Sequence, residues 1–216
     1  MKYMIHACPQ RMWYVSDYLI PSMRAQGIED IEVWNDTDGK GNLFSCMESF
    51  RACGKRPGGT WHLQDDVLIC RDFAHRTRTH DEGIVCGFAC RNFGASLQER
   101  GRVPMIFLWY SFPCVRIPNE LAGECADWFF NDAIHRSKYS QHVYERKHDD
   151  WLWREFLLER HRDGWVTNLA PNLVDHVDFL IGGTLINQQR NLQINRAAFF
   201  TDRDLVEELE RKIKDR

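Results

Sequence analysis

Short apolar runs and amphipathic stretches alternate along the first third of the chain. The runs Tyr3–Ala7, Ile31–Trp34 and Trp61–Cys70 predict strands. The spacing of apolar positions over Arg11–Gln26 and Leu43–Ala52 predicts helices between them. This β-α-β-α-β order favours a parallel sheet with crossover helices. Because such sheets bind ligands beyond the carboxyl ends of their strands, we expect a site there.

The rest of the chain continues as a mixture of helices and strands. Helices are predicted over Asp72–His80, Pro118–Asn131, Asp149–Arg162 and Thr201–Lys214, and strands over Ile84–Ala89, Met105–Tyr110 and Trp165–Asn168. Ser137–Lys147 is polar and is expected to be flexible, and Asn168–His176 is expected to be a loop. The pattern predicts one α/β domain over residues 1–216, a three-layer sandwich with a mainly parallel central sheet.

Charge and cysteine content narrow the class of protein. A net charge of -3 gives no global attraction to nucleic acid. No run approaches the roughly 18 apolar residues of a membrane span, and the N-terminus lacks the apolar core of a signal peptide. The eight cysteines form no Cys-x-x-Cys pair and are interpreted as buried free thiols. A cytoplasmic protein without a membrane span is therefore expected.

Two adjacent carboxylates, Asp65 and Asp66, stand between apolar runs at a predicted strand end. An ionised carboxylate is costly to bury unless it is paired or binds a metal. Carboxylate oxygens suit hard cations such as Mg²⁺ or Mn²⁺, which neutralise a diphosphate. A solvated turn with two aspartates explains the pattern equally well, because strand ends are often polar.

Three weaker signals follow. The pair Asp149-Asp150 opens an aromatic helix, where one carboxylate can deprotonate a hydroxyl or the pair can simply complement the helix dipole. His176 can ligate a metal through a neutral ring nitrogen, or it can be a surface group. The run Arg71–Arg78 suits a phosphate groove or a solvated helix face. Sequence signatures of dehydrogenases, kinases, serine hydrolases and zinc proteases are absent.

The order of these signals resembles the GT-A fold of nucleotide-sugar glycosyltransferases. In that family an Asp-x-Asp motif binds a divalent metal on the donor diphosphate, a later acidic pair faces the acceptor, and a C-terminal histidine often completes the metal site. Gln64-Asp65-Asp66, Asp149-Asp150 and His176 match these motifs, and the resemblance covers roughly residues 2–185. Gln64 departs from the pattern, because the family usually has an acid at that position.

The resemblance implies a GT-A-like domain with a nucleotide-binding half (1–70), an acceptor and catalytic half (71–185) and a C-terminal tail and helix (186–216). It implies that Asp66 and His176 bind Mn²⁺ or Mg²⁺. Asp150 is expected to deprotonate the acceptor and Asp149 to orient it. The residues expected to bind the nucleotide-sugar are Pro9, Gln10, Arg11, Asp36, Gln64 and Asp65.

The implied function is metal-dependent, inverting, hexosyltransferase-like transfer from a nucleotide-sugar, a UDP-sugar above all, to an acceptor hydroxyl. The acceptor is expected to be a glycan, a protein or a modified nucleic acid. Two alternatives stay open. A metal-dependent nucleotidyltransferase usually has a Gly-rich basic loop near its start, which residues 8–16 lack. A non-catalytic carbohydrate-binding protein explains aromatics such as Trp109, Tyr110 and Trp151, which can stack on a sugar or pack in the core, but not the acidic pairs.

Overall fold

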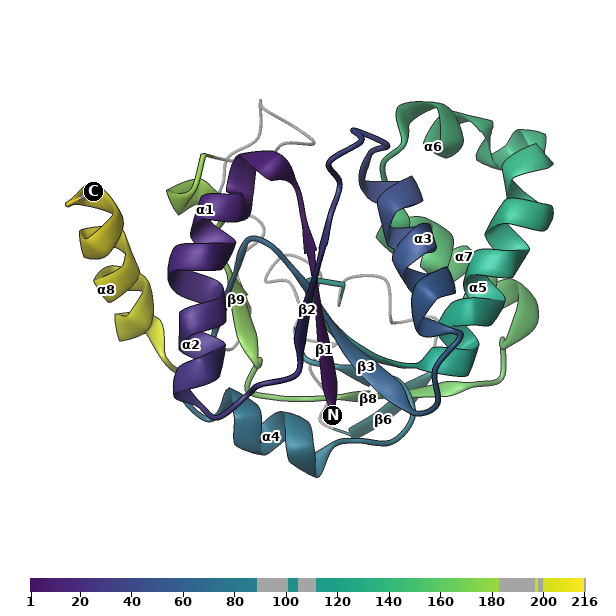
Figure 1. The fold of residues 1–216 in the computed structure, drawn as a ribbon. Coiled ribbons are helices and arrows are strands. Elements are labelled where there is room, and N and C mark those ends of the chain that lie inside the picture. The colour runs from purple at the N-terminus through teal and green to yellow at the C-terminus, as the bar shows by residue number, and fades with distance from the viewer. Residues whose placement is uncertain (89–100, 105–111, 183–196, 198–199, 216) are drawn as a thin grey trace.

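The fold is a three-layer α/β sandwich in the computed structural model, which describes residues 1–88, 101–104, 112–182, 197 and 200–215 (Figure 1). Within these residues the central sheet has seven strands in the order β2-β1-β3-β7-β5-β8-β6. They are β1 (Lys2–Ala7), β2 (Ile31–Asn35), β3 (Gly59–Gln64), β5 (Val85–Cys86), β6 (Gly101–Pro104), β7 (Cys114–Pro118) and β8 (Trp165–Asn168). Five of these strands run in one direction, and β7 and β6 run against them. The mainly parallel sheet that the sequence predicts is confirmed.

Helices cover both faces of the sheet (Figure 1). The described helices are α1 (Met12–Tyr14), α2 (Ile20–Ala25), α3 (Asn42–Cys53), α4 (Phe73–Thr79), α5 (Asn119–Asn131), α6 (Ser140–Glu145), α7 (Asp149–Arg160) and α8 (Arg203–Lys214). One face carries α1, α2 and α8, and the other carries α3, α5 and α7. Alternate strand residues enter two separate cores: Tyr3 and Ile5 pack on the α1–α2 side, whereas Met4 packs on the α3 side. Burial on both faces explains the consecutive apolar residues Tyr3–Ile5 in β1.

The helix predicted over Arg11–Gln26 is interrupted by a wider turn. Residues Val15–Leu19 form a π-helical segment between α1 and α2. Pro21 follows in the first turn of α2, where its missing N–H breaks the regular hydrogen-bond ladder. The predicted helix is therefore present, with a local change of pitch.

The strand predicted over Trp61–Cys70 is two strands in two sheets. β3 ends at Gln64, and β4 (Val67–Ile69) pairs antiparallel with β9 (Val174–His176) in a separate two-stranded sheet. The prediction of a loop over Asn168–His176 is therefore wrong for its last three residues. A strand of three residues is too short to show a periodicity in its sequence. Its partner β4 lies far earlier in the chain, so the pairing leaves no local pattern either. Its register places His176 opposite Val67, directly after the Asp65-Asp66 turn.

Other elements also differ from the predictions. Ser137–Lys147, expected to be flexible, contains a 3-10 turn and α6, with Tyr139 buried. No strand is predicted at β6 or β7. The strand predicted between them, Met105–Tyr110, lies outside the described residues. The described cysteines are free, and all but the half-buried Cys8 are buried. In the described part of the chain, no helix has the length and apolar character needed to cross a bilayer.

Candidate functional site

A cavity of about 540 Å³ opens at the carboxyl ends of β1, β2 and β3. Its volume is in the range of small-molecule and cofactor sites. It brings together eight residues that the sequence singles out: Arg11, Asp36, Gln64, Asp65, Asp66, Asp149, Asp150 and His176. Pro9 and Gln10 are exposed on the turn after β1 and do not line it. The cavity therefore unites both acidic pairs and the histidine.

The turn after β3 holds a buried cluster of charges. Asp65 accepts hydrogen bonds from the backbone N–H of Cys8 (2.8 Å) and from Arg11 Nη1 (3.0 Å). The same Arg11 nitrogen donates to Asp66 Oδ2. Burial and the charge of Asp66 raise the pKa of Asp65. Burial also favours neutral Asp66, but His176 and Arg11 outweigh it and hold the pKa of Asp66 below its usual range. Both carboxylates are buried and paired, so the prediction of a solvated turn with two exposed aspartates is wrong.

His176 faces Asp66 across the β4–β9 pair. Its Nε2 lies 3.1 Å from Asp66 Oδ1, and its Nδ1 lies 3.4 Å from Oδ1 of the buried Asp178. Burial favours the neutral ring, but the two carboxylates outweigh it and raise the pKa of His176 to about 10. Asp178 has little sequence signal, since it is one more carboxylate two residues after His176. A carboxylate on the second ring nitrogen is the usual means of orienting a metal-binding histidine.

Asp66 and His176 fit a divalent metal. Asp66 Oδ1 is buried and lies 3.1 Å from His176 Nε2. Adjacent ligands of an octahedral ion with bonds of about 2.1 Å lie about 3.0 Å apart. The described residues contain no group of three or more His, Cys, Asp or Glu side chains placed to bind a metal. Further ligands would thus come from a substrate, as Mg²⁺ commonly takes them from phosphates.

Asp36 shapes the loop that follows β2. Its two carboxylate oxygens accept hydrogen bonds from the backbone N–H groups of Lys40 and Gly41, each at 2.8 Å. The loop then packs on the segment before α7, where Leu43 N–H donates to the Arg146 carbonyl at 3.1 Å. Asp36 therefore organises one wall of the cavity as well as lining it.

Gly41→Ala should destabilise the protein by about 3 kcal/mol, since a side chain there is both strained and blocked. Gly41 has φ +87° and ψ 158°, a region that is almost restricted to glycine. A Cβ would lie 2.6 Å from Arg146 Cβ. Gly39 is the matched control, because it has φ +64° and open space around it, so Gly39→Ala should cost only about 1 kcal/mol. Urea unfolding measures both, and equal costs would contradict the tight packing.

The second acidic pair begins α7. Asp149 is buried and accepts a hydrogen bond from Asn42 Nδ2 (2.6 Å), whereas Asp150 is half-buried and accepts one from the Trp151 N–H (2.7 Å). Burial and the charge of Asp150 raise the pKa of Asp149 to about 7, and burial raises the pKa of Asp150. His148, just before the pair, has φ 65°, which is unusual for a non-glycine residue. Such strain is common at functional sites.

Asp149→Asn should stabilise the protein above neutral pH. Between about pH 4 and 7 the folded state keeps a proton on Asp149 that the unfolded chain releases, so stability falls as pH rises through this window. The amide carries no charge to bury, so the variant should gain up to about 4 kcal/mol at pH 8. Urea unfolding should show the gain shrinking by more than half at pH 5, with the exposed Asp127→Asn as control. A variant less stable than wild type at pH 8 would rule out a costly buried charge.

The other candidates that the structure describes lie away from the cavity. Trp151 stacks on His142, with ring centroids 4.1 Å apart, which agrees with core packing. Trp109 and Tyr110 lie outside the described residues. Arg71 pairs with Asp202 and Asp204 at the start of α8, and no residue of the basic run Arg71–Arg78 lines the cavity.

Comparisons with known proteins give distant similarities. No protein-family model and no curated protein matches the chain. A structure described as a glucose-1-phosphate thymidylyltransferase from Bacillus anthracis, in complex with a sucrose, is 11% identical with a TM-score of 0.43, covering 82% of this chain and 89% of that chain. The structure of A197 from STIV is 11% identical with a TM-score of 0.38, covering 81% and 84%. Neither similarity assigns a function to this chain.

Proposed function

We propose that the protein is a glycosyltransferase that moves a sugar from a nucleotide-sugar to an acceptor hydroxyl, as a single domain with its active site in the cavity. The observation that supports this is the meeting of two acidic pairs in one cavity. Asp65-Asp66 lies with Arg11 and His176 at the strand ends, and Asp149-Asp150 lies at the start of α7. One pair suits the leaving diphosphate and the other suits the incoming hydroxyl.

On the donor side, the proposal gives each residue a separate task. Asp36, Gln64 and Asp65 lie around the carboxyl ends of β2 and β3, where the nucleoside would bind. Asp66 and His176 would hold Mn²⁺ or Mg²⁺. The metal would supply positive charge to the diphosphate as the bond to the sugar breaks. Exposed Pro9 and Gln10 would contact the base only from the cavity's edge.

On the acceptor side, Asp150 is the proposed base, because it is the more accessible member of its pair. It takes the proton from the acceptor hydroxyl while the hydroxyl oxygen bonds to the sugar's anomeric carbon and the nucleoside diphosphate leaves with the bonding electrons. Attack opposite the leaving group inverts that carbon. Asp149, buried and held by Asn42, orients Asp150 and the acceptor.

Nucleotidyl transfer from a nucleoside triphosphate to a sugar phosphate is the second candidate. The basic side chains Arg11, Arg146 and Lys147 line the cavity and would suit a triphosphate. However, a phosphate nucleophile is already ionised near neutral pH, since its second pKa is about 6, and it needs no base. The Asp149-Asp150 pair would have no task in that reaction and would repel the anionic substrate. This favours glycosyl transfer.

A thermal-shift panel of nucleoside diphosphates, with and without Mn²⁺, tests the donor site. At least one diphosphate should raise the melting temperature, and Mn²⁺ should increase that rise. Nucleoside monophosphates serve as controls and should give smaller shifts. No shift with any diphosphate would contradict a donor site in this cavity.

A further inference from the structure

Arg11 is a buried cation placed between the two carboxylates of the donor site. Its Nη1 lies 3.0 Å from Asp65 Oδ1 and also pairs with Asp66 Oδ2. All three side chains are less than a tenth exposed. A single nitrogen of Arg11 contacts both carboxylates. The guanidinium therefore supplies the positive charge that a metal ion bound between the carboxylates would otherwise supply.

A metal ion that binds without a nucleotide must compete with Arg11 for the charge of Asp66. It would draw negative charge from Asp66 and weaken one of the two buried ion pairs of the guanidinium, and a buried charge becomes more costly as its pairing weakens. A metal that arrives with a diphosphate changes this balance. Phosphate oxygens are good partners for a guanidinium, so Arg11 exchanges one anionic partner for another.

We propose that Arg11 makes metal binding at Asp66 and His176 depend on the nucleotide. Arg11 holds both carboxylates until a diphosphate enters and then turns toward the phosphate oxygens. The guanidinium needs no passage through the protein, because Arg11, Asp65 and Asp66 all line the cavity that would receive the ligand. This inference rests on the proposed function, since it takes the ligand to be a nucleoside diphosphate.

Calorimetric titration of Mn²⁺ into the whole protein tests the dependence. The titration is run alone and with the best diphosphate of the thermal-shift panel, corrected for Mn²⁺ binding to free nucleotide. Wild type should bind Mn²⁺ at least tenfold more tightly with the diphosphate than without it. Arg11→Met should bind Mn²⁺ alone at least tenfold more tightly than wild type, and the diphosphate should then add less than twofold.

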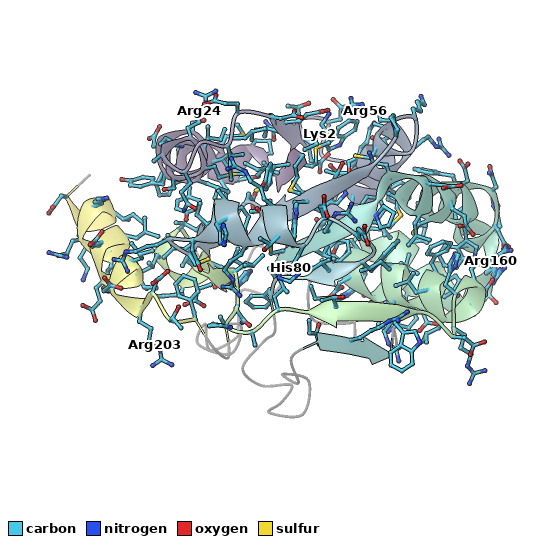
Figure 2. The ribbon with its side chains drawn as sticks, turned by 90° about the horizontal axis from the view of Figure 1, so that it is seen from below. Lys2, Arg24, Arg56, His80, Arg160 and Arg203 are labelled. Atoms are coloured by element: carbon cyan, nitrogen blue, oxygen red, sulfur yellow. The ribbon has the colours of Figure 1, made fainter. Side chains whose placement is uncertain are left out.

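Arg24→Met is the matched control, because it makes the same chemical change on an exposed side chain of α2 at the molecule's periphery (Figure 2). It should bind Mn²⁺ as wild type does. Should Arg11→Met fail to fold, the double variant Arg11→Met/Asp65→Asn removes one charge of each sign and keeps Asp66 and His176. It should show the same gain in Mn²⁺ affinity.

Two results would overturn the inference. One is a wild-type Mn²⁺ affinity that the diphosphate does not change. The other is an Arg11 variant, single or double, that binds Mn²⁺ alone no more tightly than wild type, including no binding at all. In either case, a diphosphate that still raises the melting temperature would continue to support the proposed donor site. Failure of every diphosphate to bind would instead defeat the proposed function itself.

Discussion

Asp150→Asn should slow sugar transfer by about 10²–10⁴-fold, the usual contribution of a general base. The amide has nearly the shape of the carboxylate and can still accept the Trp151 N–H, but it cannot take a proton from the acceptor. Nucleotide binding should be unchanged, because Asp150 lies at the start of α7 and not at the strand ends. Transfer is measured as release of nucleoside diphosphate, and binding is measured by thermal shift.

The neighbouring substitutions make this prediction specific. Asp149→Asn should slow transfer less than Asp150→Asn, since the buried Asp149 acts through its neighbour. The exposed Asp127→Asn should change neither transfer nor binding. In the wild type, transfer should require a higher pH than an ordinary aspartate would, because burial raises the pKa of Asp150 and the base must be ionised. Equal loss of nucleotide binding in both Asp150→Asn and Asp66→Asn would contradict separate donor and acceptor sides.

Asp66→Asn should remove the Mn²⁺-dependent part of nucleotide binding and destabilise the protein by about 3–5 kcal/mol. The substitution takes an anionic partner from both Arg11 and His176, which leaves buried positive charge uncompensated. The pKa of Asp66 lies below its usual range, so its stabilising effect is present above the ordinary Asp pKa and is lost as pH falls through the depressed one. The stability difference should therefore be full at pH 7 and shrink in strong acid.

Asp65→Asn is the matched control for that prediction. It removes an adjacent carboxylate of the same turn, but it keeps Asp66 facing His176. It should retain Mn²⁺-dependent nucleotide binding and cost less stability, because the pKa of Asp65 is raised and its charge is the more costly one to bury. If Asp65→Asn lost the Mn²⁺ effect and Asp66→Asn kept it, the two carboxylates would have exchanged roles.

The sequence is informative where the structure is local. The strand at Tyr3–Ala7 was predictable, because a parallel strand buried on both faces is a short apolar run. The half-buried edge strand at Ile31–Trp34 was predictable from its β-branched and aromatic residues. The two acidic pairs were visible because each is contiguous and stands at an element boundary. Parallel strands end at one edge of the sheet, which places Asp65-Asp66 at the cavity, whereas only the tertiary fold brings Asp149-Asp150, at the start of α7, to the same cavity.

Long-range pairing is what the sequence conceals. β9 is three residues long and becomes a strand only because β4 lies beside it. Asp178 is one acid among many until the fold buries it against His176. Arg11 precedes Asp65 by 54 residues, and nothing in the basic turn after β1 shows that its partner is a carboxylate pair. Tertiary packing decides which charged residues pair when they are far apart in sequence, so local sequence patterns cannot predict these pairs.

Phosphorus NMR of the purified protein with Mn²⁺ distinguishes the two candidate reactions directly. One sample contains a panel of nucleotide-sugars, and the other contains nucleoside triphosphates with a hexose 1-phosphate. We expect nucleoside diphosphate to form from at least one nucleotide-sugar, with water serving as a slow acceptor, and we expect Asp150→Asn to suppress it. Formation of pyrophosphate in the second sample, with no nucleoside diphosphate in the first, would contradict glycosyl transfer.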